Sequence, residues 1–167
     1  MGFGERWLKW MEATVFTSTM AVLVNGSTTA DFQVSRGLRQ GDPLSPFLFT
    51  IVADGLVGMM KQAVSGGLYR SFKLTSTVEY NLLQFADDTI LFGDGSWSNL
   101  WTLKALLKGF KMASGLRINL HKSKLYAVCS SAYKVEASAT FLGCKIDRLP
   151  FKFLGIWVGG NHRNSIF

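Results

Sequence analysis

The segment Phe85–Thr89 constrains this chain most, because it places two adjacent carboxylates, Asp87 and Asp88, between two apolar runs. The runs, 80–84 and 90–92, are rich in β-forming residues and are flanked by turn residues, which predicts a hairpin with the acidic pair at or beside its turn. Burying like charges unpaired is costly, so a pair placed between buried strands indicates a divalent cation. Mg²⁺ suits such oxygen ligands. The alternative is an ordinary Asp-Asp turn, since aspartate is common in turns.

The chain is basic, with a formal net charge of +7 over 167 residues and a pI near 9.6. Such a charge favours a polyanionic partner. No acidic residue occurs between Asp94 and Glu136, whereas the same stretch carries seven basic residues, Lys104, Lys108, Lys111, Arg117, Lys122, Lys124 and Lys134. Either these residues form a solvated face, as most charge runs do, or phosphates approach the chain on this side, just downstream of the acidic pair.

The composition excludes several classes of protein. With 48% apolar residues, the chain can form one ordinary domain. The two cysteines and two histidines have no ligand spacing, so neither zinc nor a disulfide framework is indicated. No secretory or transit signal precedes the domain, and the apolar run 47–60 is too short to cross a bilayer, where Asp54 would cost about 2.5–3.5 kcal/mol. We therefore expect an intracellular protein, in the nucleus or cytoplasm, without a membrane partner.

Apolar periodicity predicts four helices: 5–16, a largely buried helix from Ser45-Pro46 to about Gly66-Gly67, 98–114 with Gly115 as C-cap, and a weaker one over 134–141. Strands are predicted over 20–24 and 30–34, around an Asn-Gly link, and over 125–128 and 151–158. The loop 35–46 is basic, contains two glycines and leads into a helix N-terminus, an arrangement that can hold phosphates. It lacks the spacing of a Walker loop.

Taken together, these segments resemble the reverse transcriptases of non-LTR (LINE-like) retrotransposons of the kind common in plant genomes. The resemblance rests on four motifs in order: Arg36–Pro46 is similar to polymerase motif B, Phe85–Asp88 to motif C, Gly115–Leu120 with Lys122–Lys124 to motif D, and Phe153–Ile156 to motif E. The acidic pair alone is a weak signal, but the ordered set, which extends over nearly the whole chain, is strong.

The resemblance implies an α+β fold, the right-hand polymerase palm, in which an antiparallel sheet is backed by helices. It also implies an RNA-directed DNA polymerase acting on an RNA template, a DNA primer and deoxynucleoside triphosphates. The reaction would be two-metal nucleotidyl transfer with Mg²⁺, or alternatively Mn²⁺.

The family's site residues carry over to matching positions of this sequence. Asp87 and Asp88 would be the metal-binding catalytic carboxylates, and Lys122 would donate a proton to pyrophosphate. The nucleotide and the template would be bound by residues of motifs B and C, namely Arg36, Gln40, Gly41, Phe85 and Ala86. Leu154 and Gly155 would belong to the primer grip. For Arg36 and Lys122, a plain surface charge is the alternative.

The sequence departs from the family pattern in one respect, the motif A aspartate, for which nothing before Arg36 fits. Asp31 lies too close to motif B, and Glu5 and Glu12 lie on the first predicted helix. We therefore expect residues 1–167 to be a partial reverse transcriptase domain, a palm fragment with motifs B to E and without the motif A strand, fingers and thumb. With two of three carboxylates, it should have little activity alone, and its unpaired strand edges favour association.

Two other classes remain open from the sequence. One is a non-catalytic, basic nucleic-acid-binding module derived from such an enzyme, and the other is a plain structural domain. Salt-sensitive binding of nucleic acid would exclude the structural domain. Divalent-metal binding that depends on Asp87 and Asp88 would favour a polymerase site over the non-catalytic module.

Overall fold

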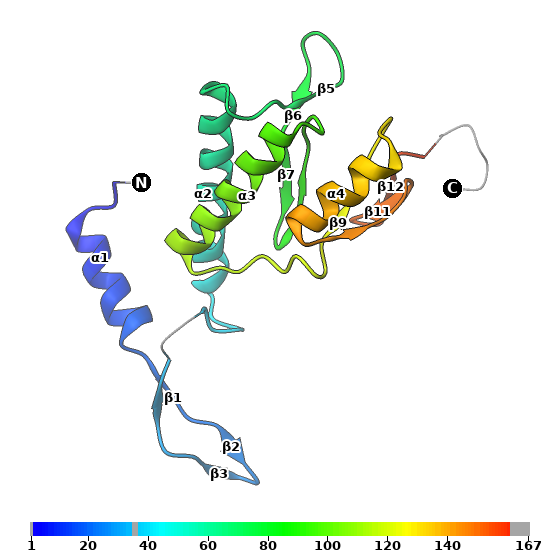
Figure 1. The fold of residues 1–167 in the computed structure, drawn as a ribbon. Helices are drawn as coiled ribbons and strands as arrows, with labels where there is room; N and C mark the ends of the chain where they lie inside the picture. Colours follow the sequence, from blue (N-terminus) through cyan, green and yellow to red (C-terminus); the bar gives the residue numbers. More distant parts are fainter. Residues whose placement is uncertain (1, 35–36, 161–167) are drawn as a thin grey trace. The chain divides into compact units, whose positions relative to one another are not determined.

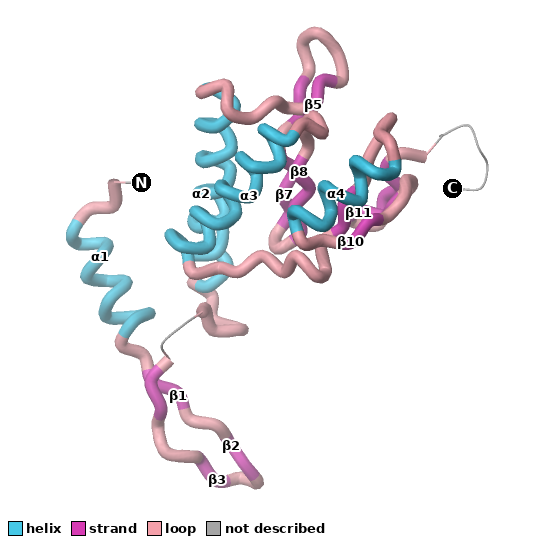
Figure 2. The backbone as a smooth tube through the Cα atoms, viewed as in Figure 1, coloured by secondary structure: helices cyan, strands magenta, loops and turns pink. Residues whose placement is uncertain are grey.

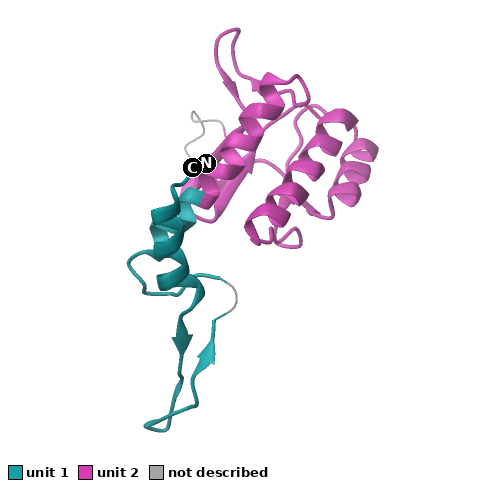
Figure 3. Cartoon of the chain, turned by 90° about the vertical axis from the view of Figure 1, so that its left-hand side faces the viewer, with its two compact units in different colours: residues 1–51 teal, residues 52–167 magenta. Residues whose placement is uncertain are grey.

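The computed structural model describes residues 2–34 and 37–160 (Figures 1 and 2). The chain divides into two compact units, Met1–Ile51 and Val52–Phe167, which Figure 3 draws in different colours. The boundary falls within one long helix, α2 (Ser45–Ser65).

Unit 1 begins with a helix that changes character partway along. α1 (Glu5–Met11) continues directly into a π-helical segment, Glu12–Phe16. The helix predicted over 5–16 is therefore confirmed, although its second half is a π-helix and not an α-helix. In that second half the hydroxyl of Thr14 donates to the carbonyl of Trp10 at 2.7 Å, and the hydroxyl of Thr17 donates to that of Ala13 at 3.2 Å. Such side-chain bonds to the backbone compete with the regular helix ladder and distort it.

A two-part hairpin follows in unit 1. Antiparallel pairs join β1 (Thr19–Met20) to β4 (Phe32–Gln33), and β2 (Leu23–Val24) to β3 (Ser27–Thr28). The connecting residues Asn25 and Gly26 have φ of 49° and 83°, the two positive values that a type I′ turn requires. The Asn-Gly hairpin predicted from the sequence is therefore confirmed.

Helix α2 begins at Ser45 and stops just before Gly66 and Gly67, as predicted, with Gly67 at φ 70°. The prediction that this helix is largely buried is wrong: Ala53, Leu56, Met60 and Ala63 are buried, while Phe47 is 70% exposed. The helix is also longer than the apolar run, at 21 residues. By length and composition alone it could cross a membrane, a criterion that core helices of soluble proteins also meet.

Unit 2 alternates helices with short strand pairs. After α2 come β5 (Phe72–Lys73), β6 (Glu79–Tyr80), β7 (Leu82–Phe85), β8 (Asp88–Leu91) and α3 (Trp97–Ser114). The chain then forms β9 (Lys124–Leu125), α4 (Ala132–Leu142), β10 (Lys145–Ile146), β11 (Phe151–Phe153) and β12 (Ile156–Val158). The predicted helices 98–114 and 134–141 thus correspond to α3 and α4, and Gly115 ends α3 at φ 74°.

The fold is mixed α/β, but its strands form small separate ladders. Over residues 2–34 and 37–160 the strands pair two by two, antiparallel except for β9 with β10, so the single helix-backed antiparallel sheet that was predicted is not seen there. Strands of two to four residues give too few ladder bonds for a wide sheet. The strand predicted over 151–158 is a hairpin instead, because Leu154 and Gly155 form a turn with φ of 51° and 81°.

The buried core of unit 2 centres on Met60, Ala63 and Tyr69. Leu82 and Leu91, which face each other across the β7–β8 hairpin, pack against this cluster, as do Val64, Leu103 and Leu106. One face of the hairpin is therefore attached to the C-terminal part of α2 and to α3 (Figure 1). This attachment determines where the acidic pair lies within unit 2.

Candidate functional site

The acidic pair lies at the end of the β7–β8 hairpin, as the sequence predicts. Phe85 pairs with Asp88, so Ala86 and Asp87 form a two-residue turn. Ala86 has a φ of 49°, a left-handed conformation that costs a residue with a Cβ about 1–2 kcal/mol. We call Phe85–Asp88 the hairpin tip.

The hairpin tip is exposed to solvent. Ala86, Asp87 and Asp88 are all exposed, and Phe85 is 61% exposed. The expectation that the acidic pair lies between buried strands is therefore wrong, because the covered face of the hairpin is at the Leu82–Leu91 end. Among the described residues, the side chains of Asp87 and Asp88 take part in no hydrogen bond or ion pair. Their oxygens are free to bind a ligand from outside the chain.

The metal-binding potential of the tip consists of these two carboxylates. Over residues 2–34 and 37–160, no group of three or more His, Cys, Asp or Glu side chains is arranged to hold a metal ion. Two exposed carboxylates fit the way Mg²⁺ is commonly bound, through one or two carboxylates together with waters and substrate phosphates. The donor set therefore fits a cation that keeps part of its coordination shell for other ligands.

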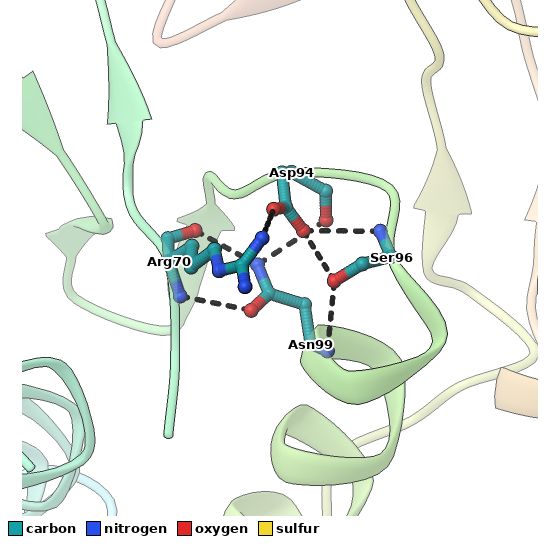
Figure 4. Close-up of polar contacts among 4 residues, drawn as sticks. All are labelled: Arg70, Asp94, Ser96 and Asn99. Carbon is teal, nitrogen blue, oxygen red and sulfur yellow. Dashed lines mark hydrogen bonds and ion pairs between the residues drawn. The ribbon is translucent and has the colours of Figure 1, made fainter. Parts of the chain in front are cut away.

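The opposite end of the hairpin is held by a buried polar network, which sequence reasoning missed (Figure 4). Asn99 of α3 is 3% exposed. Its side-chain oxygen accepts the backbone N–H of Arg70 at 2.8 Å, and its amide group donates to the carbonyls of Arg70 at 2.8 Å and Asp94 at 3.2 Å. One side chain thus links three segments: the stretch after α2, the stretch after β8, and α3.

Tyr69 and Gly93 complete this attachment. The Tyr69 hydroxyl donates to the carbonyl of Phe92 at 3.0 Å, immediately after β8. Gly93 is tightly enclosed, since a Cβ built there would lie 2.7 Å from the Tyr69 ring carbon Cζ and 2.8 Å from the Asn99 amide nitrogen. Burial raises the pKa of Tyr69 to about 12, with a smaller contribution from the charge of Asp94. We call Tyr69, Arg70, Gly93, Asp94 and Asn99 the hairpin root.

Asp94 adds an exposed ionic contact to the root. Its carboxylate lies 3.6 Å from the guanidinium of Arg70 and accepts from the hydroxyl and backbone N–H of Ser96, which is the N-cap of α3. Partial burial opposes ionisation, but the Ser96 hydrogen bonds and the charges of Arg70 and Lys134 outweigh it and lower the pKa of Asp94.

A sequence signal for the root does exist: Asn99 is a polar residue that shares a helix face with Leu103, Leu106 and Phe110.

The remaining predicted site residues belong to other segments of the chain than the hairpin tip. Arg36 is outside the described residues. Gln40 and Gly41 belong to unit 1, in a turn where Gly41 has φ 86° and the N–H of Asp42 donates to the carbonyl of Arg39 at 3.4 Å. The Asp42 carboxylate accepts from the N–H of Leu44 at 2.8 Å, in the turn just before α2.

In unit 2, Lys122 and the Leu154-Gly155 pair each lie on a turn of their own. Lys122 is exposed, and its backbone N–H donates to the side-chain oxygen of Asn119 at 3.2 Å. Leu154 is 49% exposed at the β11–β12 turn. Within the part of the chain that is described, no hydrogen bond or ion pair connects either turn to the hairpin tip.

Comparison with known proteins identifies the class. The sequence profile of the reverse transcriptase (RNA-dependent DNA polymerase) family matches residues 3–158. The chain therefore belongs to the reverse transcriptase family, and the resemblance to the enzymes of non-LTR retrotransposons is confirmed.

Two relatives show how the chain compares in extent. It is 32% identical over 169 aligned residues to a retrovirus-related Pol polyprotein from the type-1 retrotransposable element R2 of Popillia japonica, which covers 95% of this chain and 23% of that protein. It is also 32% identical over 109 residues to an uncharacterized mitochondrial protein of Arabidopsis thaliana, which covers 62% of this chain and 85% of that protein. The chain thus spans less than a quarter of the R2 polyprotein.

Proposed function

We propose that this chain forms the part of an RNA-directed DNA polymerase palm that carries the carboxylates Asp87 and Asp88 as metal ligands for nucleotidyl transfer. One observation carries the proposal. In a chain that belongs to the reverse transcriptase family, two adjacent carboxylates lie exposed at a hairpin tip, Asp87 in the two-residue turn and Asp88 directly after it, and neither side chain has a hydrogen-bond or ion-pair partner among the described residues. An ordinary structural turn would not need two adjacent like charges, which repel each other.

Mg²⁺, or Mn²⁺, would when bound there supply Lewis-acid polarisation of the phosphoryl oxygens and help to activate the primer hydroxyl. The role of the chain's own residues is to provide negative charge at a fixed position. Because the described residues offer two carboxylates and no group of three, we propose that a polypeptide of residues 1–167 alone has little or no polymerase activity.

Further roles follow from the motifs in which other residues lie. Lys122 would donate the proton that the leaving pyrophosphate needs, as a general acid, and its exposed side chain is suited to this. Arg36, Gln40, Gly41, Phe85 and Ala86 would contact the template and the incoming deoxynucleoside triphosphate. Leu154 and Gly155 would support the primer, and their place on an exposed turn is compatible with that role.

The test is to measure Mn²⁺ binding by electron paramagnetic resonance in the wild-type chain and in the variants Asp87→Asn and Asp88→Asn. Each substitution should weaken binding at least about tenfold, as losing a ligand does when few are present. Asp31→Asn is the matched control, because Asp31 is also exposed and lies in unit 1. Unchanged Mn²⁺ affinity in both Asp87→Asn and Asp88→Asn would refute the metal site.

Primer extension on an RNA template separates the two parts of the proposal. Little extension is expected from residues 1–167. Strong extension that is lost in Asp87→Asn would refute the inactivity but support the site. Strong extension that persists in Asp87→Asn would refute the assignment of the carboxylates.

A further inference from the structure

A cluster of exposed aromatic side chains lies where α3 and α4 meet, on elements other than the hairpin tip. Trp97 and Trp101 of α3 both pack edge-on against Phe141 of α4, with ring centroids 5.6 Å and 4.6 Å apart. Trp97 is nevertheless 48% exposed and Trp101 63% exposed. Phe141 also lines an open hollow of about 520 Å³ on α4 together with Tyr133, which is 84% exposed. Large exposed aromatic clusters of this kind mark interaction sites.

Lysines continue the same line along α3. Trp97, Trp101, Lys104 and Lys108 follow one another at intervals of four, three and four residues, which places them on one helix face. At 1.5 Å per residue, this row is about 16 Å long. We call Trp97, Trp101, Lys104, Lys108, Tyr133 and Phe141 the aromatic–lysine surface.

Lys104 shows how the cations and rings are combined. Its ammonium lies 4.2 Å from the centroid of the Phe141 ring and donates to the Phe141 carbonyl at 2.6 Å, near the C-terminal end of α4. That end of a helix carries partial negative charge, so Lys104 is partly neutralised there. Lys108 is exposed and, within the described residues, has no hydrogen bond or ion pair, so its charge remains available.

The charge around the surface is one-sided. In α3 and α4 the cations are Lys104, Lys108, Lys111 and Lys134, and these are opposed within the two helices by Glu136, which lies beside Tyr133 in the hollow. Lys134 also feels the charge of Asp94. The charge balance within the two helices is therefore positive, which favours phosphates.

We propose that the aromatic–lysine surface binds single-stranded nucleic acid, with unpaired bases stacked on Trp97 and Trp101 and phosphates held by the lysines. Aromatic platforms beside a basic row are the means by which proteins bind single strands without reading their sequence. A duplex hides the base faces that such stacking needs. A protein partner fits less well, because lysine is depleted in protein–protein interfaces. This surface is distinct from the proposed metal site and needs no divalent cation.

The test is fluorescence anisotropy with a labelled oligothymidylate of about 15 nucleotides, in EDTA, so that no metal-dependent binding contributes. Trp97→Ala and Trp101→Ala should each weaken binding about 5- to 100-fold, the usual effect of removing a stacking ring. Trp10→Ala is the matched control: Trp10 is 53% exposed and has the guanidinium of Arg6 at 4.8 Å from its ring centroid, yet it lies in unit 1. Binding in Trp10→Ala should stay within about twofold of wild type.

A second variant disturbs the fold less, since Lys108 is exposed and has no hydrogen bond, ion pair or ring contact among the described residues. Lys108→Ala should reduce the slope of log K against log salt by about 0.7, the value for one phosphate contact on a single strand. Lys61→Ala, an exposed lysine on α2, should leave the slope unchanged. Because the assay contains EDTA, failure of the proposed metal site would not affect this result.

Two outcomes would overturn the proposal. One is wild-type oligothymidylate affinity in Trp97→Ala and Trp101→Ala together with an unchanged salt slope in Lys108→Ala. The other is that Trp101→Ala converts a dimer into a monomer in sedimentation without altering oligonucleotide affinity, which would make the surface an interface between two copies of the chain.

Discussion

The tip and the root of the β7–β8 hairpin differ in burial, bonding and chemistry. At the tip, Asp87 and Asp88 are exposed, and their side chains form no hydrogen bond or ion pair among the described residues. At the root, Asn99 is 3% exposed and uses both ends of its amide to join three segments. Carboxylates that are to bind a cation must stay free of other partners, so the strand that bears them must be held in place at another point. In this hairpin, the root holds the strand in place.

The largest effect should come from the most enclosed position of the root. Gly93→Ala places a methyl group 2.7 Å from Tyr69 Cζ and 2.8 Å from the Asn99 amide nitrogen, so the hydrogen bonds of both residues must shift. We expect a loss of about 3 kcal/mol in the free energy of unfolding, from overpacking and broken hydrogen bonds. Urea unfolding followed by circular dichroism measures it.

Gly95→Ala is the control for that substitution, since a Cβ at Gly95 meets only the Lys134 ammonium nitrogen at 3.9 Å. It should change the free energy of unfolding by less than about 1 kcal/mol. Equal losses in Gly93→Ala and Gly95→Ala would contradict the view that the root is tightly enclosed.

The next largest effect is expected at Asn99. Asn99→Ala leaves the N–H and carbonyl of Arg70 and the carbonyl of Asp94 without this partner, at a cost of about 2–3 kcal/mol. Amide hydrogen exchange of Arg70 should accelerate accordingly. Ser98→Ala, on the exposed side of the same helix turn, should cost less than about 0.5 kcal/mol. A loss in Asn99→Ala no greater than in Ser98→Ala would show that the root is not held by this network.

A smaller effect concerns the pH dependence of the root. The pKa of Asp94 is lowered in the folded chain, so its contribution to stability is present above the unfolded value of about 3.9 and is lost as the pH falls through the folded value. Because the Arg70–Asp94 contact is largely exposed, this contribution should be below about 1 kcal/mol.

Unfolding measured between neutral pH and about pH 2 tests this. Asp94→Asn should lower stability at neutral pH and flatten its decline in acid. Part of the decline should remain, because the Lys124 ammonium also lowers the pKa of Asp147. An acid decline that is the same with and without Asp94 would contradict the assignment.

The smallest effect on stability is expected at the tip. Asp87→Asn and Asp88→Asn should each change the free energy of unfolding by less than about 0.5 kcal/mol, because both carboxylates are exposed and neither has a hydrogen bond or ion pair with another described residue. Urea unfolding of these variants beside Asn99→Ala gives the comparison directly. A loss above 2 kcal/mol at the tip would mean that these carboxylates have a structural role.

Local features of the hairpin could be predicted from the sequence. Two β-forming runs around Asp87-Asp88 indicate the paired strands and their turn, and Gly115 marks the end of α3. The exposure of the tip could not be predicted in this way, because it depends on which face of the strands the core covers. The contacts of the root could not be predicted from local sequence either, since Asn99 binds Arg70, which lies 29 positions earlier in the chain.

The β11–β12 hairpin shows a different limit. Its apolar run continues through the turn, and Leu154 adopts a φ of 51° where turn sequences usually carry Asn, Asp or Gly. The run therefore looks like one continuous strand. The four-motif resemblance names candidate site residues, which periodicity does not, but it contains no information on how the described side chains are bonded.

The most direct test of the central claim is paramagnetic broadening of backbone amide signals by Mn²⁺ in an NMR titration of the wild-type chain. If the free carboxylates of the tip bind the cation, amides of residues 85–89 should broaden first, and Asp87→Asn should abolish that broadening while leaving the signals of Arg70 and Asn99 in place. Broadening centred on Asp94 or Asp147 instead, with residues 85–89 unaffected, would contradict the account.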